Sequence, residues 1–351
     1  MKVLVTGGAG FIGSHIAEKL IARGDQVVVL DNLSNGRREH IPQGARFIEG
    51  DVRSESDVRS ALATENGAPI DAICHLAGQA STFRSFDSPS WDMEVNGIGT
   101  ARMIEGALHA GTPTFLFASS MTAYGRPASL PVTEDMPCDP ISYYGVTKLA
   151  AERAVVVTGR DAPAPMRTAA FRMFNVYGER QSLTNPYQGV LGIFLGNVLR
   201  EEPIEIHGDG EQSRDFVYVG DVADAWLLAL DNPPEQPLVV NIGTGTRISI
   251  NELWQRAVAA CGHDPGTWPF RRTLGRPGDQ RHMVADISRA QDALGWSPKM
   301  SLEAGIARTA AWARTDEGST PSRSSSTTPR QSSEPQEDPA GTGRAESPSA
   351  T

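Results

Sequence analysis

The sequence predicts an α/β fold, a doubly wound parallel sheet followed by a smaller C-terminal lobe. Two observations predict it. Short apolar runs alternate with amphipathic helical patterns over about the first 170 residues, and this alternation becomes irregular after that point. Apolar strands separated by helices are typical of a parallel sheet that helices cover on both faces. Ligands in such folds bind beyond the carboxyl ends of the strands, so the residues after each strand are the first candidates for a site.

The first strand is expected to begin at Val3, and the first helix is expected to run from Phe11 through Ile21. In the same half, further strands are expected at 26–30, 45–48, 71–77, 114–118 and 169–174, and helices at 56–63, 91–110 and 143–157. The second lobe is expected to hold strands at 204–206 and 238–242 and helices at 190–200, 222–230, 250–261, 287–294 and 302–312. The chain therefore divides into a first domain at 1–170, with contributions from about 215–245, a lobe at 171–314 and a tail at 315–351.

Composition narrows the functional class. The net charge of −10 argues against a nucleic-acid-binding surface. Cys74, Cys138 and Cys261 are far apart and lack CxxC spacing, which predicts buried free thiols in a reducing compartment and no metal site. No leader segment is expected before the first strand, and no apolar run reaches membrane-spanning length. From position 316 onward there is no Val, Ile, Leu, Met or aromatic residue, which predicts a disordered tail. We therefore expect a cytoplasmic protein that binds neither nucleic acid nor membranes.

A glycine-rich turn joins the first strand to the first helix. Gly7 lets the chain leave the strand sharply, Gly10 removes a Cβ where the backbone must approach an anion, and Gly13 allows close packing of the helix on the sheet. The free N–H groups at the start of the helix then face the same anion. This pattern predicts a dinucleotide-binding Rossmann domain.

The second strand ends at Asp31, about twenty residues after the glycines. A carboxylate there can accept hydrogen bonds from both ribose hydroxyls of an adenosine and would repel a 2′-phosphate. The sequence therefore favours NAD over NADP. Arg37 and Arg38 follow closely and leave NADP open as an alternative.

A second group of residues carries the chemistry. Ser120 follows the fifth strand, and Tyr144 and Lys148 lie four residues apart, on one face of the next helix. A tyrosine is a weak base because its ordinary pKa is about 10. A neighbouring ammonium and an oxidised nicotinamide both favour the phenolate, which could then accept a proton from a substrate hydroxyl that Ser120 holds.

In the stretches 6–15, 118–125 and 144–148 the chain resembles the extended short-chain dehydrogenase/reductase family, and specifically its nucleotide-sugar epimerases and dehydratases. Further motifs of that family match at 171–178, 208–216, 241–245 and 276–279. The resemblance covers roughly residues 1–314.

The resemblance implies a tightly held NAD and a nucleotide-diphosphate sugar as substrate. It assigns the cofactor to Gly7, Gly10, Phe11, Ile12, Gly13, Asp31, Asn32, Asp51, Val52, Ala77, Gly78, Tyr144 and Lys148. It assigns the substrate to Asn175, Arg214, Arg276 and Asp279, and the catalytic roles to Ser120, Tyr144 and Lys148. It also implies a homodimer that pairs the helices at 91–110 and 143–157 into a four-helix bundle.

The reaction is inferred from two positions. Dehydratases of the family carry an Asp-Glu pair directly after the catalytic Ser or Thr, and decarboxylases carry a glutamate at the second position. Here these residues are Met121 and Thr122, which cannot act as carboxylate acids or bases. The parts that remain suffice for epimerisation at C4 through a transient 4-keto sugar.

Several alternatives stay open at this point. The sugar could be UDP-glucose or UDP-galactose, or a dTDP-linked 6-deoxyhexose such as dTDP-L-rhamnose, because 180–187 resembles epimerases of that type. Galactose-type epimerases often have a lysine where this chain has Ala80. The other readings are a nucleotide-sugar reductase or dehydrogenase that releases its cofactor, a dehydratase, and a non-catalytic dinucleotide sensor.

Overall fold

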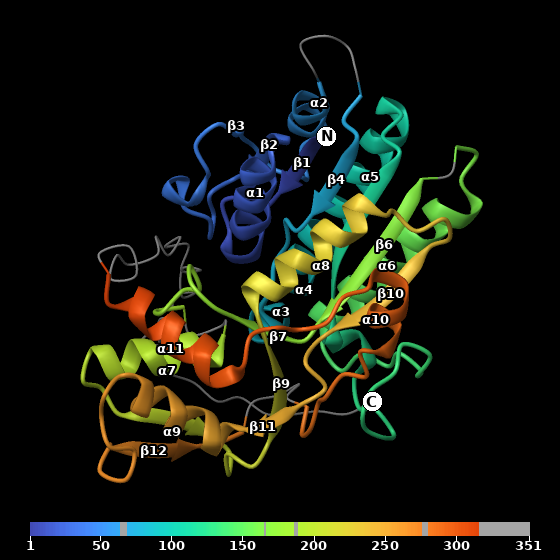
Figure 1. Ribbon diagram of the computed structural model, residues 1–351. Helices are drawn as coiled ribbons and strands as arrows, with labels where there is room; N and C mark the ends of the chain where they lie inside the picture. Colours follow the sequence, from blue (N-terminus) through green and yellow to red (C-terminus); the bar gives the residue numbers. More distant parts are fainter. Residues whose placement is uncertain (64–68, 165, 186–188, 276–279, 316–351) are drawn as a thin grey trace, which may run out of the picture.

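The computed structural model describes residues 1–63, 69–164, 166–185, 189–275 and 280–315. Its centre is a seven-stranded sheet in the order β10-β6-β5-β4-β1-β2-β3, and every neighbouring pair in it is parallel. The strands are β1 Lys2–Thr6, β2 Gln26–Asp31, β3 Arg46–Glu49, β4 Ala72–His75, β5 Thr114–Ser120, β6 Arg167–Met173 and β10 Leu238–Ile242. The predicted doubly wound fold is thus confirmed (Figure 1).

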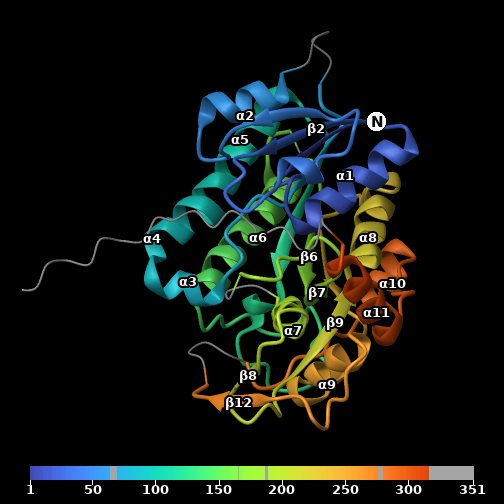
Figure 2. The ribbon, with the colours of Figure 1, turned by 90° about the vertical axis from the view of Figure 1, so that its left-hand side faces the viewer.

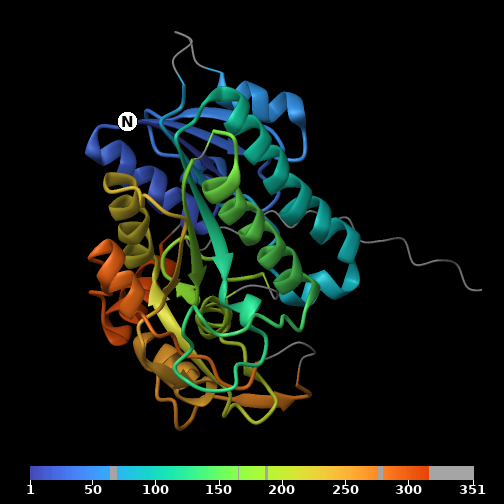
Figure 3. The same ribbon diagram turned by 90° about the vertical axis from the view of Figure 1, so that its right-hand side faces the viewer.

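Helices cover both faces of this sheet. One layer contains α1 Phe11–Arg23, α8 Val219–Asp231 and α10 Ser288–Leu294, and the opposite layer contains α2 Glu55–Leu62, α5 Gly99–Ala110 and α6 Tyr143–Asp161. Figure 3 shows the sheet between the two layers. The central strands are almost wholly buried, which is why their sequences read as continuous apolar runs.

A second lobe packs below the carboxyl ends of the sheet (Figure 2). It has its own apolar core and consists of α7 Val190–Leu199, α9 Ile250–Ala260, α11 Leu302–Ala313, a three-stranded sheet β11-β9-β7 and a parallel pair β12-β8. These strands are β7 Asn175–Tyr177, β8 Ile204–His207, β9 Ser213–Tyr218, β11 Arg247–Ser249 and β12 Phe270–Thr273.

The sequence patterns did not indicate β7, β9, β11 or β12. Strand β9 illustrates the reason, because it begins with the polar residues Ser213, Arg214 and Asp215 and yet is buried throughout. The carboxylate of Asp215 accepts hydrogen bonds from the backbone N–H groups of Thr244, Gly245 and Ala285. A polar strand start is stable inside the protein when the fold supplies such partners.

The helix expected at 91–110 is present as one unbroken helical stretch, but its winding changes along its length. It consists of α4 Pro89–Asp92, a π-helical segment Met93–Ile98, and α5, which follow one another directly. A short helix, α3 Thr82–Asp87, precedes it and was not expected. The wider turn brings the side chain of Asn96 onto the backbone of Gln79, with Asn96 Nδ2 donating to the Gln79 carbonyl oxygen at 3.1 Å. Such π segments frequently occur at functional sites.

Two other sequence predictions need comment. The strand expected at 71–77 ends at His75, and the N–H of Ala77 donates to the Thr6 hydroxyl at 3.1 Å. The three cysteines are free thiols, but only Cys74 and Cys261 are buried, so the prediction was wrong for the half-buried Cys138. Residues 316–351 of the predicted tail lie outside the described residues.

Within the part of the chain that the structure describes, no helix is long and apolar enough to cross a membrane. The same residues contain no cluster of three or more His, Cys, Asp or Glu side chains with the arrangement of a metal site.

Candidate active site

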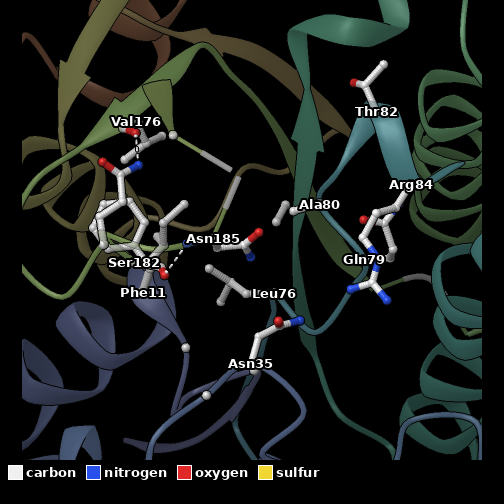
Figure 4. A pocket seen from close by; sticks show the side chains of 18 of the residues that line it. Phe11, Asn35, Leu76, Gln79, Ala80, Thr82, Arg84, Val176, Ser182 and Asn185 are labelled. Atoms are coloured by element: carbon white, nitrogen blue, oxygen red, sulfur yellow. Dashed lines mark hydrogen bonds between the residues drawn. The ribbon is translucent and has the colours of Figure 1, made fainter. Parts of the chain in front are cut away.

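A large cleft of about 1920 Å³ lies at the carboxyl ends of the sheet strands and continues into the second lobe. Figure 4 shows part of its lining, with Phe11 and Leu76 from the first domain and Val176, Ser182 and Asn185 from the second lobe. Every predicted site residue within the described residues lines this cleft: Gly7, Gly10, Phe11, Ile12, Gly13, Asp31, Asn32, Asp51, Val52, Ala77, Gly78, Ser120, Tyr144, Lys148, Asn175 and Arg214. Arg276 and Asp279 lie outside the described residues.

The glycine turn forms a narrow cradle between β1 and α1. Gly7 has φ +69°, and a Cβ there would lie 2.8 Å from the backbone nitrogen of Ala77. A Cβ on Gly13 would collide with the carbonyl oxygen of Gly7. Gly10 precedes α1, and no described side chain caps this end of the helix. The helix N-terminus is therefore open to an anionic group, as the diphosphate of a dinucleotide requires.

Asp31 closes β2 at the edge of the cleft. Its Oδ2 accepts a hydrogen bond from the Ala9 N–H at 3.0 Å, and its Oδ1 accepts one from the Leu33 N–H at 2.8 Å. Burial raises the pKa of this carboxyl, and the two backbone hydrogen bonds oppose the rise. The carboxylate is held in a fixed orientation at the position where the sequence predicts recognition of a ribose.

The two arginines that left NADP open have carboxylate partners. The Arg38 guanidinium lies 4.6 Å from the centre of the Phe47 ring and pairs with Glu49 at 3.1 Å. Arg37 lies 3.9 Å from the Glu39 carboxylate. These contacts favour NAD over a cofactor that carries a 2′-phosphate.

Asp51 lies beside Asp31 at the end of the next strand. Its carboxylate accepts hydrogen bonds from Arg53, at 2.8 and 3.0 Å, and from Asn32 Nδ2 at 3.0 Å. The hydrogen bonds of Arg53 lower the pKa of Asp51 to about 2, against the effect of burial. Asn32 and Asp51, which were predicted separately, are thus joined by a hydrogen bond at the end of the cleft where the sequence predicts the adenosine.

Ser120, Tyr144 and Lys148 converge on the floor of the cleft. Ser120 is the last residue of β5, and its Oγ lies 2.9 Å from the hydroxyl of Thr122. Ser142 caps α6 by accepting a hydrogen bond from the Gly145 N–H at 3.1 Å, which starts the helix just before Tyr144. One turn later Lys148 Nζ donates to the carbonyl oxygen of Ala118 at 3.1 Å.

Burial dominates the electrostatics of this trio. It raises the pKa of Tyr144 to about 12, and the hydrogen bond with Ser120 opposes the rise. Burial lowers the pKa of Lys148 to about 8. A lysine whose pKa is so low can lose its proton near physiological pH, so its charge depends on neighbouring groups.

Gly78 brings the backbone after β4 directly against this trio. A Cβ on Gly78 would lie 2.8 Å from Asn96 Oδ1 and 3.1 Å from Lys148 Nζ. Asn96 in turn fixes the next residue, because its Oδ1 accepts a hydrogen bond from the Gln79 N–H at 2.9 Å. Sequence reasoning missed Asn96, although an asparagine followed by Gly97 and Gly99 is unusual for a helix interior.

The two described substrate candidates come from neighbouring strands of the second lobe. Asn175 begins β7, and Arg214 lies on β9, which pairs with β7 in parallel. The Asn175 amide oxygen is buried and has no hydrogen-bond partner among the described residues. The Arg214 side chain is also buried, and its Nη1 donates to the Ser213 carbonyl oxygen at 2.9 Å. A ligand group that donates a hydrogen bond would supply the partner that the Asn175 oxygen lacks.

The cradle, the fixed ribose carboxylate and the Ser-Tyr-Lys group define a dinucleotide-dependent enzyme with a doubly wound fold. The chain belongs to the NAD dependent epimerase/dehydratase family, whose model matches residues 3–243. The family's cofactor is NAD. The open helix N-terminus fits its diphosphate, and Gly7 and Gly13 leave no room for a Cβ in the turn that would bind it.

Individual proteins similar to this chain over most of its length belong to the same class of enzyme. The UDP-glucose 4-epimerase of Mycolicibacterium smegmatis is 37% identical over 317 residues, which are 88% of this chain and 97% of that protein. A UDP-glucose 4-epimerase of Thermotoga maritima, solved with UDP-glucose, has a TM-score of 0.83 and 37% identity, over 90% of this chain and 99% of its own. The Thermus thermophilus UDP-glucose 4-epimerase, solved with NAD, has a TM-score of 0.82 and 36% identity, over 90% and 100% of the two chains.

Proposed function

We propose that this enzyme inverts the configuration at C4 of a hexose attached to a nucleoside diphosphate, with UDP-glucose and UDP-galactose as its substrate pair. The observation that carries the proposal is the convergence of Ser120, Tyr144 and Lys148 beside the glycine cradle in one cleft. The names of the similar proteins support the choice of UDP-hexoses.

When bound, NAD supplies the acceptor and donor of the C4 hydride and a positively charged ring. Tyr144 is the base that takes the proton of the C4 hydroxyl and returns a proton after inversion. Ser120 hydrogen-bonds the same hydroxyl, and the positive charge of Lys148 favours the phenolate of Tyr144. Arg214 and the amide NH2 group of Asn175 hold the diphosphate while the sugar turns. Arg276 is proposed to complete that hold, and Asp279 is proposed to lie near the nucleotide ribose.

The residues that follow Ser120 favour inversion over elimination or decarboxylation. Met121 is buried, and the Thr122 hydroxyl lies 2.9 Å from Ser120 Oγ. Both side chains line the cleft, and neither carries the carboxylate that dehydration or decarboxylation in this family uses. With NAD bound as hydride acceptor and donor, the remaining groups could support oxidation and re-reduction of C4 without any net redox change.

A dTDP-linked 6-deoxyhexose is the second substrate candidate. The segment that resembles epimerases of such sugars lines the cleft from Arg180 through Asn185, and residues 186–188 lie outside the described residues. Ala80, in place of a lysine, also lines the cleft. Small differences of this kind decide sugar specificity, because a pocket selects a hexose through contacts with individual hydroxyls.

A substrate panel tests the proposed function. We expect the purified enzyme to convert UDP-glucose and UDP-galactose into each other with no accumulation of NADH. NMR of the anomeric and H4 signals measures the conversion. Inversion of dTDP-L-rhamnose alone would replace the substrate pair and keep the reaction. Stoichiometric NADH would identify a dehydrogenase, and absence of turnover on every UDP-, dTDP- and GDP-hexose would favour a dinucleotide sensor.

We also propose that the enzyme is a homodimer. Large exposed apolar side chains gather on α3, on the π-helical segment and on α6, which pack against one another: Phe83, Phe86, Met93, Ile98, Tyr143, Val146 and Val157. Exposed apolar side chains that gather on neighbouring helices are typical of an interface patch. In a two-fold symmetric dimer the same helices of the two copies would pack against each other, so each copy would bury the patch of the other.

Charges placed on this patch should separate the two copies. We expect Val146→Glu combined with Val157→Glu to turn the dimer into a monomer, because each copy would bring two carboxylates into an apolar interface. Sedimentation equilibrium measures the change. Leu274→Glu is the matched control, since this side chain is 91% exposed and lies in the second lobe. A monomeric unmodified enzyme, or a double variant that remains dimeric, would contradict the proposed interface.

We propose a cytoplasmic location, supported by the three free thiols, which are typical of a reducing compartment. We further propose that the two parts of the chain bind different ligands. Residues 1–170 bind mainly NAD, and residues 171–314 bind mainly the sugar nucleotide.

A further inference from the structure

Asp92 is a buried carboxylate next to the catalytic groups that the proposed mechanism does not use. It is fully buried at the end of α4, just before the π-helical segment. The hydrogen-bond partners of its carboxylate among the described residues are all neutral side chains. A carboxylate in the interior is costly unless its surroundings stabilise the charge, so its position needs an explanation.

Three neutral donors surround this carboxylate. Gln79 Nε2 donates to its Oδ1 at 2.5 Å, and the Thr147 hydroxyl donates to its Oδ2 at 2.5 Å. Asn96 Nδ2 approaches Oδ2 at 3.4 Å. Gln79 follows Gly78 in the loop that lines the cleft, and Thr147 precedes Lys148 on α6. Asp92 thus ties the cofactor side of the cleft to the catalytic helix.

The negative charge of Asp92 acts on both catalytic groups of α6. It raises the pKa of Lys148, against burial, which lowers it to about 8. It also raises the pKa of Tyr144. His75 on β4 faces Lys148 as well, but burial lowers the pKa of this imidazole so far that it is neutral. Glu152, one turn beyond Lys148, pairs with Arg172 at 2.6 Å.

We propose that Asp92 is a positioning residue of the active site, whose buried carboxylate fixes Gln79 and Thr147 and acts as the counter-charge to Lys148, the residue after Thr147 on α6. This inference rests on the proposed role of Lys148 and goes beyond it, because it names the group on which the charge of Lys148 depends. Without that charge the phenolate of Tyr144 loses its neighbouring cation.

The direct test is a titration of Lys148. The chain has four lysines, Lys2, Lys19, Lys148 and Lys299, so ¹³C-ε-lysine NMR of the cofactor-containing enzyme gives few signals, and Lys148→Arg assigns the relevant one. We expect Asp92→Asn to lower the pKa of Lys148 by about one pH unit. The sign follows from the loss of an anion that stabilises the ammonium, so Lys148 loses its proton at lower pH.

Kinetics give a second readout. A lower pKa of Lys148 moves the alkaline limb of kcat to lower pH. A purely structural role of Asp92 would lower Tm without moving the limb. Glu94→Gln is the matched control, since it removes an exposed carboxylate two residues away that pairs with Arg53.

An unchanged Lys148 titration in folded Asp92→Asn would overturn the proposal. If that variant does not fold, Asp92→Ser removes the same charge with a smaller side chain, and an unchanged titration there has the same consequence. The titration needs no sugar substrate. Failure of the epimerase assay would therefore refute the proposed function without affecting the Lys148 titration. An unchanged titration would likewise refute the role of Asp92 without affecting the proposed function.

Discussion

Tyr144→Phe is expected to lower kcat for C4 inversion by about 10³-fold, which is the usual contribution of a positioned acid or base. The substitution removes one oxygen atom from a side chain that is only 8% exposed, so the packing of α6 against β5 should persist. The variant should still hold NAD, because the glycine cradle and Asp31 do not depend on the phenol. The measurement is NMR of epimer formation under saturating substrate.

The neighbouring residue offers a close control. Tyr143 lies on the same helical turn and is 47% exposed, so Tyr143→Phe removes an equivalent hydroxyl that faces away from the cleft. It should retain activity close to that of the unmodified enzyme. Comparable turnover of both variants would show that another group moves the proton, and the Ser120-Tyr144-Lys148 assignment would fail.

Features that depend on local sequence were predictable. The spacing of the first-turn glycines and Asp31 follows from the path of the backbone through a strand, a tight turn and a helix. Tyr144 and Lys148 share a face because a helix brings residues four apart together. The resulting predictions of fold, family and NAD dependence are confirmed by the family model and the similar solved structures. The individual residue roles remain predictions.

Features that depend on contacts distant in sequence were not predictable. Asp92 resembles any exposed helical carboxylate until the fold places Gln79 and Thr147 beside it. The buried start of β9 is similar, because the partners of Asp215 come from segments about 30 and 70 residues away. Polar residues in such places read as loop or surface, since sequence periodicity reports burial only through apolar side chains.

The second large effect concerns the cofactor. Gly7→Ala is expected to give an enzyme that is purified without bound NAD and whose activity with added NAD falls on the order of 100-fold, as a displacement of about 1 Å in an active site can cause. The added Cβ would lie 2.8 Å from the Ala77 nitrogen and 3.0 Å from the Leu76 carbonyl carbon. The turn and the loop after β4 must then separate, and both line the cofactor cleft.

Conformational strain alone must be separated from this collision, because Gly7 has φ +69° and any L-residue is strained there. Gly24, which ends α1, has φ +92°, and no described atom lies within 4 Å of the place that a Cβ would take, so Gly24→Ala introduces comparable strain in open space. It should lower Tm and retain NAD. Equal loss of NAD in both variants would trace the effect to the stability of α1. A turn that contacts the anion through its backbone cannot widen without losing those contacts. Retention of NAD by Gly7→Ala would therefore show that the turn tolerates a side chain and that the diphosphate binds elsewhere.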